Sequence, residues 1–239
     1  MIDLTKKKIL VFDLEVVPYD FETHYDEHTK EYLLKYASTP EEKKYVLDNL
    51  VFNSFTSKLI AIGMLDLSDN KGAVLVNAPE GVILTSQYEE INYRVYEEKR
   101  MVELFWDTLK EKNYDLFVTF NGREFDCPYI MLKSFELGIR PSRNLMRGTD
   151  FNIKDYHIDL LKELGFNKHS AVGARRKFSL DFYCRQLGIT SPKANGVAGD
   201  QVAQLYENKE YQVIADYCFG DVKAEAELFI KWNELLNFY

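Results

Sequence analysis

Cysteine is scarce in this sequence, and the positions of the few cysteines argue against a fold held together by disulfides or zinc. Three are present, Cys127, Cys184 and Cys218, and no two of them form a CxxC pair. Disulfide frameworks and structural zinc sites both rely on several cysteines at characteristic spacings. We therefore expect neither a disulfide framework nor a structural zinc site, and we interpret the three side chains as small buried hydrophobes.

Long apolar segments are also lacking. No run approaches the roughly 18 consecutive apolar residues that mark a membrane-spanning helix. The first residues, MIDLTKKKILVFDLE, have neither the long apolar region nor the small-residue cleavage site of a signal peptide. The sequence therefore predicts a soluble, cytoplasmic protein without a membrane partner.

A surplus of positive charge is the third missing feature. The chain carries 30 lysines and arginines against 38 aspartates and glutamates, which gives a formal net charge of -8. Proteins that coat nucleic acid by bulk electrostatics need a basic surface, so this class is excluded. An enzyme that holds a short strand locally remains compatible with this charge, particularly where metal ions neutralise part of it.

What the sequence does contain is the pattern of one α/β domain, for which a length of 239 residues is sufficient. The first four predicted strands look like an antiparallel meander, and a later strand, helix and strand imply a parallel crossover. Residues 20–56 form a predicted helical insertion. The predicted strands cover residues 7–14, 58–67, 72–77, 81–85, 115–120 and 156–160, and the predicted later helices cover 97–112, 127–137, 179–187, 199–206 and 211–236.

Acidic residues stand at three places where a core is expected. The apolar run ILVF is followed by Asp13 and Glu15, which as residues i and i+2 point to the same side of a strand. Asp126 follows the strand DLFVTF, and Asp221 lies within the apolar face of the last helix. Carboxylates are costly to bury unless they are paired, hydrogen-bonded or bound to a metal.

Each of these acids also has a structural interpretation. Asp13 and Glu15 could be the polar end of a strand, Asp126 a helix N-cap, and Asp221 an edge residue that reaches solvent. Together, however, they lie at the ends of strands and on a packed helix, where an open α/β sheet carries its site. Converging carboxylates would repel one another, and divalent cations would resolve this. A pair of such ions about 4 Å apart is the arrangement that cleaves phosphodiesters.

Three short motifs carry a resemblance to a known family. They are FDLE at residues 12–15, FNGREFDCPYI at 120–130 and YCFGD at 217–221. In order and spacing they resemble the three exonuclease motifs of the DEDD superfamily, in the form that has tyrosine in the third motif. The second motif is similar to that of the proofreading exonuclease domain of family B DNA polymerases. The resemblance covers nearly the whole chain.

The resemblance implies a ribonuclease H-like α/β fold, with a five-stranded mixed sheet of three antiparallel and then two parallel strands, flanked by helices. It implies one exonuclease domain over residues 1–239, including the insertion. Two divalent cations, Mg²⁺ or Mn²⁺, would be bound by four carboxylates, and Tyr217 would orient the attacking water together with Glu15. The implied metal ligands are Asp13, Glu15, Asp126 and Asp221.

The implied activity is a metal-dependent 3′ to 5′ exonuclease that hydrolyses terminal phosphodiesters of single-stranded nucleic acid and releases nucleoside 5′-monophosphates. DNA is favoured as the substrate because the second motif resembles proofreading domains, and the expected partners are replication or repair proteins. An RNA-trimming exoribonuclease is an alternative within the same superfamily. An inactive, nucleic-acid-binding relative is a further alternative, although such relatives usually lose a metal ligand and all four are present here.

Several other residues are candidates for contacts with the substrate. Leu14 and Phe125 flank acidic ligands and could pack against terminal bases, although a core role suits Phe125 as well. Asn121 could contact the terminal nucleotide, or could simply be a turn residue after a strand. A basic segment, KHSAVGARRK, precedes a helix and is either a solvated loop or a source of phosphate contacts. Its candidate residues are Arg175, Arg176 and Lys177.

Overall fold

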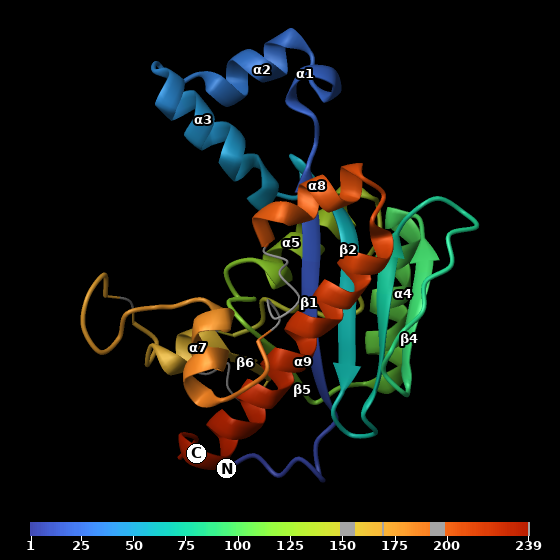
Figure 1. The fold of residues 1–239 in the computed structure, drawn as a ribbon, viewed down its shortest axis with the longest axis vertical. Helices are drawn as coiled ribbons and strands as arrows, with labels where there is room; N and C mark the ends of the chain where they lie inside the picture. The colour runs from blue at the N-terminus through green and yellow to red at the C-terminus, as the bar shows by residue number, and fades with distance from the viewer. Residues whose placement is uncertain (149–155, 169, 192–198, 239) are drawn as a thin grey trace.

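A mixed six-stranded sheet lies between two layers of helices (Figure 1). This computed structural model describes residues 1–148, 156–168, 170–191 and 199–238. The strand order is β4-β3-β2-β1-β5-β6, so β1 lies in the interior of the sheet. The strands are β1 (Ile9–Pro18), β2 (Ser57–Asp66), β3 (Lys71–Asn77), β4 (Ile91–Tyr96), β5 (Leu116–Thr119) and β6 (His157–Asp159).

The pairing of the strands is antiparallel on one side of β1 and parallel on the other. β1 pairs antiparallel with β2, and β2 pairs antiparallel with β3. β1 with β5, and β5 with β6, are parallel pairs. The mixed α/β class and the change from antiparallel to parallel strands agree with the sequence-based expectation.

The fourth predicted strand was placed wrongly, and the sheet has six strands rather than five. Residues 81–85 form no strand, and the edge of β3 pairs instead with Ile91–Tyr96, in parallel. A strand gains stability from a hydrogen-bonded partner, and residues 81–85 have none in the sheet. The alternating segment INYRVY takes the place beside β3, so the first four strands are not an antiparallel meander throughout.

Each face of the sheet is covered by its own helices. Helix α9 (Tyr211–Leu235) crosses one face and packs on β1, β2, β3 and β5. Helices α4 (Glu98–Lys112) and α5 (Asp126–Glu136) cover the other face. Alternation along β1 sends Ile9 and Val11 into the cluster around α9, and sends Leu10 and Phe12 into the cluster around α4 and α5. Further elements that follow β6 are α6 (Leu160–Leu164), α7 (Leu180–Leu187), η3 (Gly199–Gln201) and α8 (Val202–Glu207).

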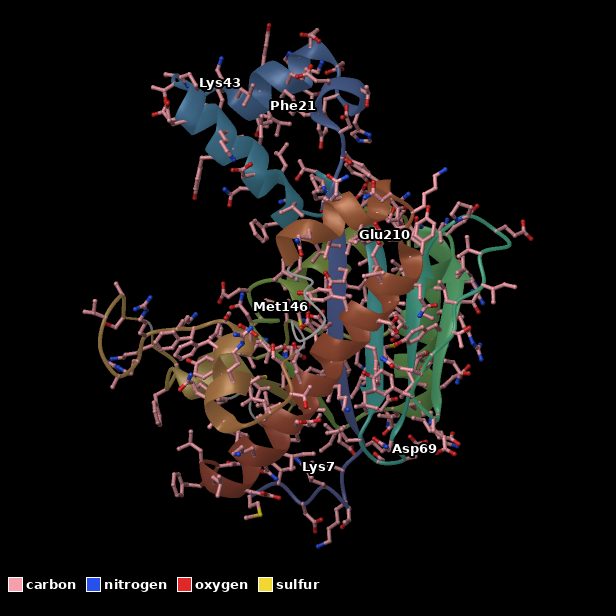
Figure 2. All side chains as sticks on the ribbon, viewed as in Figure 1. Lys7, Phe21, Lys43, Asp69, Met146 and Glu210 are labelled. Atoms are coloured by element: carbon pink, nitrogen blue, oxygen red, sulfur yellow. The ribbon has the colours of Figure 1, made fainter. Side chains whose placement is uncertain are left out.

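The segment between β1 and β2 projects from one end of the sheet (Figure 1). Its elements are α1 (Phe21–His24), α2 (Glu27–Leu34), α3 (Pro40–Asn49) and η1 (Leu50–Phe52). No residue of α1, α2 or α3 is buried. Phe21 and Lys43 lie on these projecting helices, beyond the end of the sheet (Figure 2).

None of the helices in the described part of the chain combines the length and the apolar character that crossing a bilayer requires.

Candidate active site

Strand β1 places two of the predicted ligands on the face of the sheet that α9 covers. Asp13 and Glu15 share the side of β1 that carries Ile9 and Val11, because alternate residues of a strand point to the same face. Glu15 is 8% exposed. The side chain between them, Leu14, is buried on the opposite face, among the residues that pack against α4 and α5.

Helix α5 begins with Asp126, whose carboxylate reaches back to β1. Its Oδ1 accepts a hydrogen bond of 3.1 Å from the backbone N–H of Leu14, and the side chain is buried. β5 pairs with β1 only as far as Val11, so this N–H lies beyond the last pairing and Asp126 serves as its acceptor. The alternative of Asp126 as an N-cap is wrong, because Phe125 is the N-cap residue of α5. The hydrogen bond holds Asp126 beside the acidic segment of β1.

Helix α9 contributes the third part of the site. Tyr217 and Asp221 are four residues apart on α9, so they lie on the same side of the helix. Burial raises the pKa of the Tyr217 hydroxyl far above its usual value, and the negative charges of Asp221, Glu15 and Asp13 raise it further. The phenol is therefore neutral at physiological pH and keeps the proton with which it can donate a hydrogen bond.

A glycine on β2 allows α9 to approach the sheet closely at this level. Gly63 pairs with Asp13 across β1 and β2. A Cβ atom at position 63 would lie 2.7 Å from Cγ2 of Val222 and 2.9 Å from Sγ of Cys218, both on α9. Such contacts are too short to be accommodated, so any other residue would displace the helix or these side chains. The glycine thus keeps α9 near the acidic residues of β1.

The carboxylates form a negative cluster in which Glu15 and Asp126 are buried and Asp13 is half-buried. Burial raises the pKa values of Asp13 and Glu15 well above their usual range, and neighbouring carboxylates raise both further. Burial likewise raises the pKa of Asp126, to about 7. Among the residues that the structure describes, no lysine or arginine forms an ion pair with these three side chains. These three carboxylates therefore lack a cationic partner within the described chain.

The donor atoms of the cluster fit a hard divalent cation. A carboxylate oxygen of Asp13, one of Glu15 and Sγ of Cys218 lie within 4.8 Å of one another. Carboxylate oxygens are the preferred ligands of Mg²⁺ and Mn²⁺. Burial raises the pKa of the Cys218 thiol well above its usual value, so the sulfur is protonated and a poor ligand. The oxygen atoms, and not the thiol, are the suitable metal ligands.

Comparison with known proteins assigns the chain to a family. A family described as "Predicted 3'-5' exonuclease related to the exonuclease domain of PolB" matches residues 54–236, which is more than half of the chain. The chain belongs to this PolB-related exonuclease family. This result confirms the resemblance to the exonuclease domain of family B DNA polymerases, which the three motifs had indicated.

The relatives of this PolB-related chain are much longer proteins. The DNA polymerase of Thermococcus aggregans is 23% identical over 262 residues, which cover 93% of this chain and 14% of the polymerase. The DNA polymerase of Thermococcus litoralis is 27% identical over 150 residues, which cover 56% of this chain and 8% of the polymerase. This chain therefore spans only a small fraction of the length of these relatives.

A solved structure supports the fold of the PolB-related chain. The structure of the family B DNA polymerase from Pyrobaculum calidifontis matches with a TM-score of 0.58 at 17% identity, and the match covers 95% of this chain and 24% of that chain. The match confirms the ribonuclease H-like α/β fold, with the difference in strand number described above.

The loop that leads from β5 to Asp126 is held by a residue that the motifs did not identify. Asp159, at the end of β6, accepts hydrogen bonds from the backbone N–H groups of Asn121 and Arg123, both at 3.0 Å. Asn121 has a φ of 67°, so its backbone forms the turn that the sequence suggested as an alternative to substrate binding. An acid at the end of a neighbouring parallel strand was the available signal for Asp159.

The predicted substrate residues lie in different surroundings. Leu14 is 4% exposed and its side chain is part of the core. Phe125 is half-buried, and its ring meets the ring of Phe52 edge-on at 6.1 Å and that of Tyr129 at 5.4 Å. The loop before α7 projects outward (Figure 1). It carries Arg175 and Arg176, which are exposed, and Lys177, which is half-buried.

Two further buried charges escaped the sequence analysis. Glu225 lies on α9 four residues after Asp221 and is buried. That spacing places it on the same side of the helix, which is a signal that the sequence contains. Lys133 on α5 is fully buried, yet in the sequence it resembles an ordinary surface lysine of a helix.

Proposed function

We propose that this protein is a metal-dependent 3′ to 5′ exonuclease that hydrolyses the terminal phosphodiester of single-stranded nucleic acid. The observation that carries the proposal is the meeting of acidic residues from β1, α5 and α9 in one buried cluster, fixed by the hydrogen bond from Leu14 to Asp126. Buried carboxylates with strongly raised pKa values are typical of functional sites rather than of structural cores.

Two divalent cations, Mg²⁺ or Mn²⁺, are the proposed cofactors, and Asp13, Glu15, Asp126 and Asp221 would hold them. When bound, such cations neutralise the carboxylates and supply Lewis-acid activation of water and of the scissile phosphate. We assign to Tyr217, whose hydroxyl stays protonated, the orientation of the attacking water together with Glu15. The water oxygen bonds to phosphorus, the bond to the 3′ oxygen breaks, and that oxygen takes a proton. The products are a nucleoside 5′-monophosphate and a strand one nucleotide shorter.

The substrate end would be held by aromatic stacking next to the cluster. Phe125 directly precedes Asp126, and the ring of Phe52 lies beside it with 63% of the residue exposed. Exposed aromatic rings bind bases of any sequence, which suits an exonuclease. We propose that Phe125 and Phe52 contact the terminal bases, whereas the buried side chain of Leu14 makes no such contact. We propose that Arg175, Arg176 and Lys177 contact phosphates of the nucleic-acid strand further from its 3′ end.

DNA is the proposed substrate, because the similar proteins described above are DNA polymerases. We further propose action in the cytoplasm on 3′ ends generated during replication or repair, with proteins of those processes as partners. Trimming of RNA is the second candidate, because single-strand stacking alone does not discriminate between the two nucleic acids.

A degradation time course on 5′-labelled DNA and RNA oligonucleotides tests the proposal. With Mg²⁺ or Mn²⁺, the wild-type protein should give a ladder that shortens from the 3′ end, and Asp13→Ala should abolish it. Asp107→Ala, which removes an exposed aspartate of α4, is the matched control and should be as active as the wild type. The absence of any ladder from the wild type with either metal would overturn the proposal in favour of a binding protein. Faster trimming of RNA would overturn only the choice of DNA.

A further inference from the structure

Glu225 is a buried acidic residue outside the three motifs. It lies on α9 four residues beyond Asp221 and is 1% exposed. Its Oε1 accepts a hydrogen bond of 3.1 Å from the backbone N–H of Phe120, the residue that follows β5. Its other oxygen, Oε2, is buried and has no hydrogen-bond partner among the described residues. One oxygen of the carboxylate therefore has a hydrogen-bond partner, and the other has none within the described residues.

An unpartnered oxygen at this depth needs an explanation. A buried polar atom without a partner costs about 1–3 kcal/mol, and more if the group is charged. The neighbouring buried positions on α9 are apolar, with Val222, Ala226 and Phe229 in the core. The packing at position 225 therefore requires one acceptor for the N–H of Phe120, and it gives no reason for a second buried oxygen. Unsatisfied groups in a folded protein often mark a function rather than a structural need.

The position of Glu225 relates it to the acidic cluster. Burial raises the pKa of Glu225 well above its usual value, and the charges of Asp126 and Asp221 raise it further. Glu225 in turn contributes to the raised pKa of Asp13. Three of the four motif carboxylates are therefore within electrostatic reach of Glu225. No lysine or arginine in the described ranges forms an ion pair with Glu225.

We propose that Glu225 is a fifth acidic residue of the divalent-cation site, with Oε2 reserved for the cation or its bound water. The inference rests on the proposed function and adds a residue to the same site. Glu225 also fixes the end of β5 through Oε1, and this strand leads into the loop that ends at Asp126. The residue therefore connects cation binding through Oε2 to the position of that loop through Oε1.

Binding of Mn²⁺ to the metal-free protein of residues 1–239 tests this inference by calorimetry. Glu225→Gln retains an oxygen that can accept the hydrogen bond from Phe120 but removes the charge. Loss of an outer ligand-supporting group typically weakens metal affinity by about 10- to 100-fold, and we expect a loss of that size. Thermal unfolding of the metal-free variant should occur at the same temperature as in the wild type or higher, because a buried like-charge repulsion is removed. Glu227→Gln, two residues further along α9, is the matched control and should bind Mn²⁺ normally.

The outcomes separate this inference from the proposed function. If Glu225→Gln binds Mn²⁺ as tightly as the wild type, Glu225 only supports the end of β5 and the inference is overturned. If the wild type itself binds no Mn²⁺, both the inference and the proposed function are overturned. If Glu225→Gln does not fold, Glu225→Asp replaces it, since it keeps the charge but withdraws the carboxylate by one methylene. An unchanged Mn²⁺ affinity of Glu225→Asp would then overturn the inference.

Discussion

Helix α5 carries two buried charges of opposite sign, and their surroundings differ completely. Lys133 is fully buried, and its Nζ donates to the carbonyl oxygens of Ser54 at 2.6 Å and Ser57 at 2.8 Å. A carboxylate oxygen of Glu136 lies 2.8 Å from the same nitrogen. Asp126, at the start of the same helix, has neighbours that are themselves acidic. The chain thus surrounds the cation with acceptors, whereas Asp126 receives the backbone N–H of Leu14 but forms no ion pair within the described residues.

The difference indicates which charge is structural and which is functional. A buried charge with a full set of partners holds segments together, and removal of one partner is costly. Lys133 joins α5 to both ends of the projecting segment, because it also donates to the hydroxyl of Tyr19 at 3.3 Å. A buried carboxylate without a cationic partner is instead suited to a cation that binds from solution. Among the described residues, Asp13, Glu15 and Asp126 are of this second kind.

The largest expected effect concerns the activity of the acidic cluster. Asp126→Asn keeps an oxygen for the N–H of Leu14, so folding should be preserved, whereas exonuclease activity should fall by at least about 1,000-fold. The rate on a labelled oligonucleotide and the temperature of thermal unfolding are the two measurements. Asp107→Asn is the control for loss of an exposed aspartate. A marked fall in the unfolding temperature of Asp126→Asn would place Asp126 with the structural charges and erase the contrast with Lys133.

Replacement of Lys133, the buried positive charge of α5, should have its effect on stability rather than on activity. Lys133→Met should lower the free energy of unfolding by about 3–5 kcal/mol, because Glu136 and two carbonyl oxygens lose their partner. Urea unfolding followed by circular dichroism measures this loss. Lys110→Met, at an exposed position of α4, should change the value by less than about 0.5 kcal/mol. A loss as small as that of the control would mean that Lys133 does not hold the projecting segment.

The acidic cluster should also make the stability of the metal-free protein depend on pH. The pKa of Asp126 is about 7 in the folded protein, against about 3.9 in an unfolded chain. The folded state therefore retains a proton that the unfolded state loses, so metal-free stability should fall as the pH rises from about 4 to 7. Saturating Mg²⁺ should remove this decline, because the cation takes the place of the proton. Unfolding temperatures across this range, with and without Mg²⁺, provide the check, and a rise without metal would contradict the prediction.

The smallest expected effect concerns the end of the projecting segment that lies nearest the site. Phe52→Ala should raise the KM for a single-stranded oligonucleotide by about 5- to 10-fold with little change in kcat, because a stacking contact is lost. Tyr45→Ala removes a comparably exposed ring of α3 and serves as the control. An equal rise in KM for both variants would show that the effect is not specific to the ring beside Phe125.

Local patterns sufficed to predict which acidic residues on the regular elements face the same side. Alternation put Asp13 and Glu15 on one side of β1, and the apolar stripe of α9 singled out Asp221. The hydrogen bond from Leu14 to Asp126 depends on where β5 stops pairing with β1, and this register cannot be read from either segment alone. Motif order indicated that these residues belong together, whereas only the fold gives their contacts.

Burial that depends on distant partners was beyond the reach of sequence patterns. Lys133 is separated by 79 and 76 residues from the two serines whose carbonyl oxygens it contacts. The strand at 81–85 was predicted from an apolar, β-branched run, but the choice between that run and Ile91–Tyr96 is made by the free edge of β3. Both errors have the same origin, because local composition does not specify which surface will be available for pairing.

Gly63 shows that a residue without any chemistry of its own can set the dimensions of a site. Its φ is not in the left-handed region, so backbone freedom is not the reason for glycine here. Glycine is required here because α9 leaves no room for a side chain at position 63. The sheet and α9 carry different carboxylates, and at Gly63 these two layers lie so close that one added methyl group would meet Val222 and Cys218 at less than 3 Å. Position 63 therefore sets the distance between the carboxylates of β1 and Asp221 of α9, and a larger residue there would change that distance without replacing any of the carboxylates.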